Sequence, residues 1–479
     1  MFTPGTGSYS CINQQQKMSL NNQLGSLWQW LLNFFTKGHP RSLEAKKNIM
    51  VSLFIKGASI AIGLILVPLT IHYVNPSQYG IWVTLSSMVA WISFFDIGFT
   101  HGLRNRFAEA KANGNKELAR TYISTTYYYI GIIFIVLWIL LIIVTQFINW
   151  YKLLNVPASM EKELTVLVML IFSYFCLQFI FRIINTILIA DQKSAKASLI
   201  DMLGQLFSLL IIFILTKTTR GSLLYLALAI GIAPTLILIL SNFFFFNTAY
   251  KEYKPSLSYV KKRYAKDIMS LGMRFFVLQI AAIIQFESIL FLIAHYFKPE
   301  QVTPYSIAYK YFFTLQMIFT ILLSPLWSGV TDAYNSGDMD WIKNAIKKYL
   351  IILAPFILLG AIMLAVSGVV YDIWVGKEVV YVKFSLSLLC YIYFSVTMFA
   401  SIFVSVINGI GALRIQFFSS LVTPVLFLSL SIILIKQFHF GVESILLSSI
   451  VSNVFGYIIA PVQVYNIFYK KSEARIWYR

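Results

Sequence analysis

The chain has 479 residues, of which 58% are apolar and only 12% are charged. Soluble globular proteins average about 25% charged residues, so this composition excludes a water-soluble enzyme. The net charge of +19 is common in nucleic-acid-binding proteins, but in a membrane protein it must first be examined as a topology signal. The three cysteines, Cys11, Cys176 and Cys390, are too far apart in sequence for a disulfide framework or a metal-binding motif.

Apolar runs of about 20 residues, long enough to cross a bilayer as helices, recur throughout the chain. They predict an all-α integral membrane protein with about twelve transmembrane helices, at 48–74, 79–99, 121–148, 163–190, 197–216, 222–248, 270–297, 303–327, 347–374, 381–408, 413–435 and 441–469. No connection between these runs is long enough for a folded domain. No G-x-x-x-x-G-K-[ST] phosphate loop occurs, and we expect no cofactor and no metal.

The positions of the apolar runs and of the segments between them divide the chain into five predicted parts. Near the N-terminus, Trp28 and Trp30 would anchor a short interfacial helix, and Met18 is a second candidate start. The predicted parts are an N-terminal extension that is disordered or interfacial, 1–42; an N-lobe of six helices, 43–248; a cytoplasmic amphipathic linker, 249–269; a C-lobe of six helices, 270–471; and a cytoplasmic tail, 472–479.

The basic residues are distributed unequally between the two sides of the predicted membrane. With the N-terminus in the cytoplasm, 26 of the 38 lysines and arginines fall in inner segments, eight in outer segments and four inside helices. Because basic loops favour the cytoplasmic side, this bias predicts that both termini are cytoplasmic. It also accounts for most of the net charge, so the expected partner is the lipid bilayer and not nucleic acid.

Two stretches separated by 223 residues resemble each other. The sequence HYVNPSQ at 72–78 matches HYFKPEQ at 295–301 in four of seven positions, and its histidines are interpreted as helix-end residues. The same offset, without a gap, aligns Glu109-Ala110 with Asp332-Ala333, Gly114-Asn115 with Gly337-Asp338, Glu117 with Asp340, and Arg120 with Lys343. Six predicted helices separate the matched positions, so the halves are parallel repeats related by an axis along the membrane normal. This symmetry predicts two bundles that face each other across a cleft.

Charged side chains inside apolar helices cost about 2.5–3.5 kcal/mol each to insert, and those that remain usually face a wet interior. The chain has six prominent ones: Lys56, Asp96, Arg182, Arg274, Glu287 and Lys310. Lys56 and Arg182 have no evident acidic partner except Asp96, so they are the first candidates for binding an anionic cargo. Lys310 has two open interpretations, cargo binding or pairing with Glu287. Arg274 and Asp96 lie near the inner mouth, where a structural role is favoured for both. The alternatives are cargo binding by Arg274 and ion coupling by Asp96. Glu287 is the other candidate for the acid that couples transport to an ion.

Small and polar residues share a helix face with three of these bases, because they lie three or four positions before or after them or at further helical repeats. The three polar faces are Ser52, Lys56 and Ser59; Tyr174, Gln178, Arg182 and Asn185; and Ser306, Lys310 and Thr314. Such faces predict a hydrated, cationic cavity. Since arginine binds phosphate in a bidentate manner and lysine acts as a point charge, the cavity favours a phosphate or diphosphate cargo.

The segment FDIGFTHGLRNRFAEA, from Phe95 to Ala110, resembles the loop after the second helix in bacterial O-antigen and capsule flippases. These proteins form the polysaccharide transporter branch of the multidrug/oligosaccharidyl-lipid/polysaccharide exporter (MOP) superfamily. Residues 150–157 and 325–334 are similar to other stretches of that family, and the resemblance runs from about Leu43 to Lys471. The loop motif and its repeat counterpart comprise Gly102, Arg104, Arg106, Glu109, Gly114, Asp332 and Gly337.

This resemblance implies a non-enzymatic flippase with a MATE-like fold in the bacterial inner membrane. Its cargo would be an undecaprenyl-diphosphate-linked glycan for O-antigen or capsule synthesis, and a polysaccharide polymerase would be a candidate partner. Family members rock two lobes between inward-open and outward-open states. The cavity residues are not part of the resemblance, because they rest on the polar faces alone.

Two other functions stay open at this point. A drug or cation antiporter of the same superfamily should present acids to its cargo, whereas bases outnumber acids four to two among the six charges within the helices. An O-antigen polymerase, which is an enzyme, should carry a large basic outer loop, but the longest predicted outer loop is only 149–162.

Overall fold

A computed structural model describes residues 40–92, 99–269, 287–470 and 477, and this part of the chain contains helices and no strand. The first half contains α2 (Pro40–Val74), α3 (Pro76–Ile92), α4 (Phe99–Ala112), α5 (Lys116–Thr145), α6 (Trp150–Leu153), η2 (Ala158–Met160), α7 (Glu161–Phe181), α8 (Ile183–Ala190), α9 (Ser194–Thr218), α10 (Leu223–Asn247), η3 (Lys251–Tyr253) and η4 (Leu257–Tyr259). The second half contains α12 (Ser288–Phe297), α13 (Pro299–Asn335), α14 (Met339–Ala365), α15 (Ser367–Val375), α16 (Phe384–Ile410), α17 (Arg414–Lys436), α18 (Glu443–Ser452), the π-helical turn η5 (Phe455–Ile459) and α19 (Ala460–Phe468).

The long apolar helices make the chain a multi-pass membrane protein. Within the described ranges, nine helices are long and apolar enough to cross a bilayer, and a tenth is counted if the bent pair formed by α18 with η5 and α19 is one span. The remaining two predicted spans, 79–99 and 270–297, correspond in part to α3 and α12, and each includes residues outside the described ranges. The predicted interfacial helix near Trp28 also lies outside them.

Two predicted spans are interrupted in the structure. The run 347–374 is α14 followed by the separate helix α15, because the helix breaks at Val366 beside a Ser-Gly pair, and Ser367 donates a 2.8 Å hydrogen bond to the Leu364 carbonyl. The run 163–190 is divided into α7 and α8 at Arg182. The predicted span 163–190 still crosses as one unit, Ala158–Ala190, whereas the span predicted to end at 374 ends as a crossing helix at Ala365.

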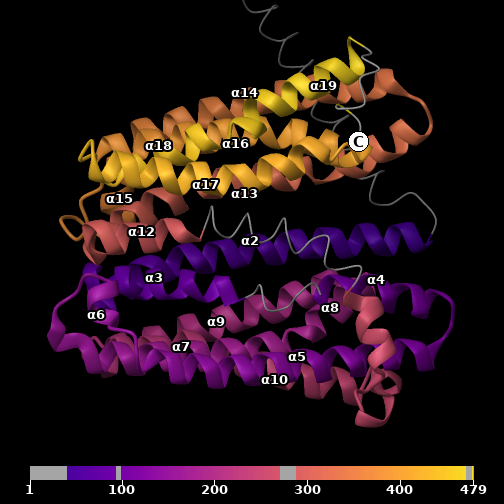
Figure 1. Ribbon diagram of the computed structural model, residues 1–479, viewed down its shortest axis with the longest axis horizontal. Helices are drawn as coiled ribbons and strands as arrows, with labels where there is room; N and C mark the ends of the chain where they lie inside the picture. Colours follow the sequence, from indigo (N-terminus) through magenta and orange to yellow (C-terminus); the bar gives the residue numbers. More distant parts are fainter. Residues whose placement is uncertain (1–39, 93–98, 270–286, 471–476, 478–479) are drawn as a thin grey trace, which may run out of the picture.

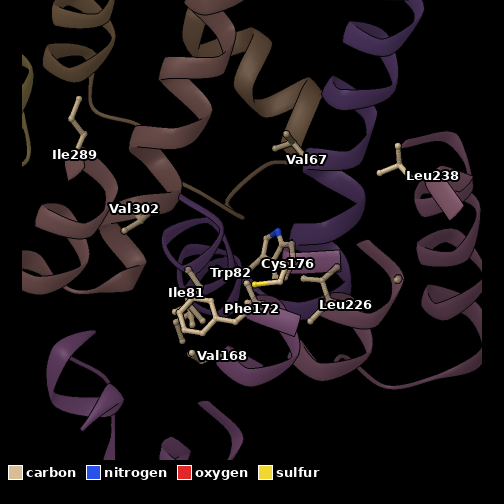
Figure 2. Packing of buried hydrophobic residues seen from close by; sticks show 14 of the residues in the cluster. Val67, Ile81, Trp82, Val168, Phe172, Cys176, Leu226, Leu238, Ile289 and Val302 are labelled. Carbon is tan, nitrogen blue, oxygen red and sulfur yellow. The ribbon is translucent and has the colours of Figure 1, made fainter. Parts of the chain in front are cut away.

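The helices form two bundles, one from each half of the chain (Figure 1). In the first bundle α2 packs on α9 and α10 packs on α7 and α9, and in the second α13 packs on α16. One buried hydrophobic cluster combines side chains of the first bundle with side chains of the second, among them Ile289 and Val302 (Figure 2). A separate cluster, which includes Leu326 and Phe403, belongs to the second bundle alone. Among the described residues, the two lobes therefore share a core at the end of α12 and α3, whereas those at the opposite end of the second lobe form a core of their own.

The two repeated turns meet at this shared end. Asn75 and Lys298, which the offset of 223 matches, both adopt a φ of 107° directly before a proline. Ser77 Oγ donates to Glu300 Oε1 at 2.7 Å, and these residues are also separated by 223 positions. Matched residues of the repeat thus contact each other across the boundary between the lobes.

A second pair of contacts at this end is reciprocal. Thr303 Oγ1 donates to the carbonyl of Pro76 at 2.6 Å. At the equivalent place, a Cβ on Gly80 would lie only 2.0 Å from the carbonyl oxygen of Pro299, so only glycine allows this approach of α3 to α13. Since Gly80 corresponds to Thr303 and Pro76 to Pro299, the two lobes contact each other here about a local two-fold axis.

The repeated histidines take part in the same arrangement. His295 Nδ1 is hydrogen-bonded to the Leu153 carbonyl at 3.0 Å, and a Cβ on Gly376 would lie 3.3 Å from His72 Cε1. Leu153 and Gly376 again differ by 223 positions. Each histidine therefore lies in the last turn of a helix of one lobe, as its interpretation as a helix-end residue predicts, and contacts the equivalent position of the other lobe.

Candidate functional site

A cleft of about 580 Å³ lies between α2 of the first lobe and α13 of the second. Two lysines line it, Lys56 from α2 and Lys310 from α13, together with Ser59 and Thr314 from the predicted polar faces. The other residues that line it are Ile60, Gly63, Leu64, Gln205, Phe313, Gln316, Met317, Thr320 and Ile321. None of these described residues is an acid. The structure thus brings two of the predicted cavity bases, from different halves of the chain, to one cleft.

Lys310 connects the cleft to the contact between the lobes. Its Nζ donates a 2.8 Å hydrogen bond to the hydroxyl of Tyr79 and lies 5.5 Å from the centre of the Tyr79 ring. Tyr79 belongs to α3 and is buried, so the lysine is held by a fixed partner of the opposite lobe. An ammonium group has three N–H donors, and the hydrogen bond to Tyr79 uses one of them. No ion pair joins Lys310 to Glu287 within the described residues, so the pairing considered from the sequence is not formed.

Two glutamines of the cleft were missed by the sequence analysis. The side-chain oxygens Oε1 of Gln205 and Gln316 are buried, and neither has a hydrogen-bond partner in the described part of the chain. A buried amide without a partner is costly, so these oxygens are suited to accept hydrogen bonds from water or from a hydroxyl-bearing ligand. Both glutamines lie within predicted apolar runs, where an uncharged amide is itself a polar signal that a search for charges does not detect.

The polar face of α7 and α8 does not reach this cleft. Gln178 Nε2 donates to the Gly231 carbonyl and to Thr235 Oγ1, each at 3.1 Å. A Cβ on Gly231 would overlap the ring of Tyr174, which shows how closely that ring packs on α10. This face therefore joins helices of the first lobe.

Arg182 has an acidic partner that the sequence analysis did not name. Its Nη2 lies 3.4 Å from Asp201 Oδ1 of α9, and Asn185 donates to the same oxygen at 3.0 Å. The expectation that only Asp96 could pair with Arg182 was wrong, because Asp201 lies near a helix end and was not counted among the intramembrane charges. Arg182 and Asn185 are not among the residues that line the cleft.

The other predicted site residues lie at several places. Ser306 is buried in α13 and is not part of the cleft wall, and Ser52 lies in α2. Glu287 is partly buried directly before α12 and also does not line the cleft. Arg274 and Asp96 lie outside the described residues.

The loop motif attaches the linker to the first lobe. Arg106 donates to Glu109 at 3.0 Å and to Asp267 at 2.6 Å, and Tyr122 donates to the other oxygen of Asp267 at 2.9 Å. A Cβ on Gly102 would lie 2.2 Å from the Ile268 carbonyl oxygen, so glycine is needed where α4 meets the linker.

The remaining motif residues lie in helices or in the turns that connect them. Arg104 is exposed, and Asp332 lies within α13. Gly114 and Gly337 have φ values of 70° and 78°, as expected for glycines that end helices. These two glycines are another matched pair of the repeat.

An ionic cluster at the same end of the first lobe involves Asp191, which follows α8. Lys111, Lys193 and the hydroxyl of Tyr250 all donate to its carboxylate. Burial alone would raise the pKa of Asp191, but the hydrogen bonds from Lys111, Lys193 and Tyr250 together outweigh it and hold the pKa below its ordinary value. This cluster is satisfied within the lobe and serves to hold α4, the turn after α8 and η3 together.

Comparison with known proteins identifies the family. A family model described as polysaccharide biosynthesis protein matches residues 45–328, which is more than half of the chain. The chain belongs to this family. No curated protein matches the chain.

Solved structures show which fold this polysaccharide biosynthesis protein has. A multidrug resistance MATE family transporter of the MOP superfamily in its inward-facing conformation is similar with a TM-score of 0.70 and 13% identity, over 88% of this chain and 96% of that one. A MATE in complex with MaL6 has a TM-score of 0.62 and 14% identity, over 92% and 99% of the two chains. An outward-facing multidrug resistance MATE transporter has a TM-score of 0.57 and 13% identity, over 92% and 99%. The fold is thus that of MATE transporters, as the sequence resemblance implied.

Proposed function

We propose that this protein is a flippase that moves an undecaprenyl-diphosphate-linked oligosaccharide across the bacterial inner membrane by alternating access. The observation that carries the proposal is the cleft between the lobes, in which Lys56 and Lys310 face the same cavity and the described lining contains no acid. Membership of a polysaccharide biosynthesis family and the MATE-type fold support it.

The cleft supplies the chemistry that such a cargo needs. The negative charges of a diphosphate can pair with both lysines, and the attraction between opposite charges is stronger in a partly desolvated cavity than in bulk water. The amides of Gln205 and Gln316 and the hydroxyls of Ser59 and Thr320 offer hydrogen bonds to sugar hydroxyls. The polar head would cross within the cleft because transfer of unpaired polar groups through hydrocarbon is prohibitive.

The contact between the lobes suggests which state the structure represents. The repeated turns contact each other at the end where Asn75 and Lys298 lie, while the described residues at the opposite ends belong to separate cores. The distribution of basic residues supports a periplasmic location for the end where the turns meet and a cytoplasmic location for both termini. In this proposal the structure is an inward-facing state, and transport requires the turn contacts to separate.

A drug or cation antiporter is the alternative of the same fold. A cationic cargo would need a carboxylate in the cleft, whereas the described lining offers two ammonium groups. The absence of an acid from this lining therefore favours an anionic cargo.

Binding and flipping can be measured with the purified full-length protein. Reconstituted proteoliposomes would carry a fluorescent undecaprenyl-diphosphate-linked oligosaccharide, and its accessibility to a membrane-impermeant quencher would report translocation. We expect translocation by the native protein, strong loss in a variant with both Lys56→Ala and Lys310→Ala, and no loss in Lys217→Ala, whose lysine lies at the end of α9 away from the cleft. If the native protein binds and moves a cationic dye but not this lipid, the proposal is wrong.

A cross-link tests the alternating-access step separately. A disulfide between Ser77→Cys and Glu300→Cys would hold the turns together, because the native side chains already form a 2.7 Å hydrogen bond. We expect oxidation to stop flipping and reduction to restore it, with either single cysteine variant unaffected by oxidant. Undiminished flipping by the oxidised double variant would show that this end need not open.

A further inference from the structure

A second cavity, of about 540 Å³, lies beside the cleft and is bounded by α2, α13 and α15. Its wall includes the apolar side chains of Ile65, Met363, Val370 and Ile373. Ile65 is 54% exposed and Ile373 is 80% exposed, so the cavity opens on the surface of a protein whose surroundings are hydrocarbon. Its volume is within the range of about 300–1,000 Å³ found for small-molecule sites.

The three polar side chains on this wall donate their hydrogens to backbone carbonyls. Trp374 Nε1 donates to the Leu64 carbonyl at 2.9 Å, which is the carbonyl that Pro68, lacking an N–H, leaves without its helical partner. Tyr311 donates to the Met363 carbonyl at 3.1 Å, and Thr314 donates to the Lys310 carbonyl at 3.0 Å. A wall whose donors are already used suits a hydrocarbon ligand and not a sugar or a phosphate.

The apolar cavity and the cationic cleft are continuous. Leu64 and Thr314 line both, and Thr314 lies one helical turn, about 6 Å along the axis, from Lys310. A molecule with an anionic head at Lys310 and a hydrocarbon chain would therefore have a polar site and an apolar site side by side. This continuity distinguishes the cavity from an ordinary groove for a bilayer lipid, whose head would lie at the membrane surface.

We propose that this cavity binds the part of the cargo's polyprenyl chain nearest to its diphosphate, while the diphosphate lies in the cleft. The proposal rests on the proposed function and adds a site for the lipid part of the substrate. The site gives the chain a defined exit from the cleft between α2 and α15, so the head can be enclosed while the tail remains in hydrocarbon.

Photo-crosslinking of the full-length protein in nanodiscs tests the site. The probe is a farnesyl diphosphate analogue with a benzophenone on its isoprenoid chain, and labelled residues are identified by mass spectrometry. We expect labels on Ile65, Val370 or Ile373, and competition by unlabelled undecaprenyl diphosphate. Val370→Trp should fill the cavity and abolish these labels, whereas Val369→Trp, at an exposed neighbouring position outside the cavity wall, should keep them. Thermal unfolding checks that both variants fold.

A second probe, a phosphatidylglycerol with the same photoreactive group on its acyl chain, separates the two sources of a hydrocarbon chain. Equal labelling by both probes, without competition by undecaprenyl diphosphate, would show a bilayer-lipid site and overturn this inference. Labels from the diphosphate probe near Lys56 and Lys310 but none in the apolar cavity would overturn the inference while the proposed function stands. If native mass spectrometry detects no binding of the isoprenyl diphosphate at all, both fail.

Discussion

The polar face of α7 and the polar faces of α2 and α13 each carry a base among polar residues at helical spacing, but their surroundings differ. Gln178 on α7 has two hydrogen-bond partners on α10, whereas Gln316 on α13 lies in the cleft with a side-chain oxygen that has no partner in the described residues. Arg182 faces Asp201, but the side-chain partner of Lys310 within the described ranges is an uncharged tyrosine, Tyr79. Helical spacing of polar residues therefore shows that a helix face is not in lipid, and the partner on the neighbouring helix determines whether that face joins helices or binds a ligand.

If the face of α13 binds an anionic cargo, reversal of the charge of Lys310 should have the largest effect of the substitutions considered, and this effect should be on cargo affinity. Lys310→Glu would place an acid where an anionic cargo binds, so affinity for undecaprenyl diphosphate should fall by roughly a hundredfold, since hydrogen bonds to charged groups contribute about 1.5–3 kcal/mol and repulsion adds to their loss. Binding to the purified protein is measured by microscale thermophoresis. Lys217→Glu is the matched control, and an unchanged affinity in Lys310→Glu would remove this lysine from the site.

Asp191→Asn should instead affect stability. The substitution leaves Lys111 and Lys193 without their shared carboxylate, and the expected loss is about 1–3 kcal/mol of unfolding free energy at neutral pH. Because the folded protein holds the pKa of Asp191 below its ordinary value, the stabilisation is present above about pH 4 and disappears as the pH falls through the lowered pKa.

The difference in thermal midpoint between native protein and Asp191→Asn should accordingly shrink below about pH 4. Thermal unfolding across a pH series measures it, and affinity for undecaprenyl diphosphate at neutral pH should stay the same. A difference that persists unchanged at low pH would contradict the assigned role of the ionised carboxylate.

The smallest effects come from the same substitution at two glutamines. Gln178→Leu removes two hydrogen bonds that contribute about 0.6 kcal/mol each on average between membrane helices, so it should lower stability by about 1 kcal/mol and leave transport intact. Gln316→Leu should leave stability equal or slightly higher, because it removes a buried oxygen without a partner, and should slow transport severalfold.

Thermal unfolding and the flipping assay, applied to both leucine variants, give four values that test this contrast. Reversed results, with Gln178→Leu impaired in transport and Gln316→Leu impaired in stability, would mean that the two faces have been assigned the wrong roles.

Much of the fold could be predicted from the sequence because hydrocarbon imposes a simple rule on it. Backbone groups must be paired within each span, so length and apolarity identify the helices, and the offset of 223 between His72 and His295 relates the two lobes. Apolarity does not report local breaks, so the interruptions at Val366 and Arg182 were not predicted. They depend on hydrogen bonds such as that from Ser367 to Leu364.

The candidate site could be predicted only in part for a related reason. The cost of a buried charge singled out Lys56 and Lys310, and the structure places both on one cleft. The same cost singled out Arg182, which does not line the cleft. Its partner Asp201 lies on another helix, and such a pairing cannot be inferred from spacing along one helix. Gln205 and Gln316 carry no charge, so their importance depends on the absence of a partner in three dimensions.

The reciprocal meeting of the two turns also bears on assembly. In a contact built from equivalent surfaces, each surface is satisfied by its counterpart and nothing is left over for a third member. Here both counterparts belong to a single polypeptide, through Ser77 with Glu300 and Thr303 with Pro76. Each turn already has its partner within the same molecule, so this face is not available for a contact with a second copy while the two lobes remain joined.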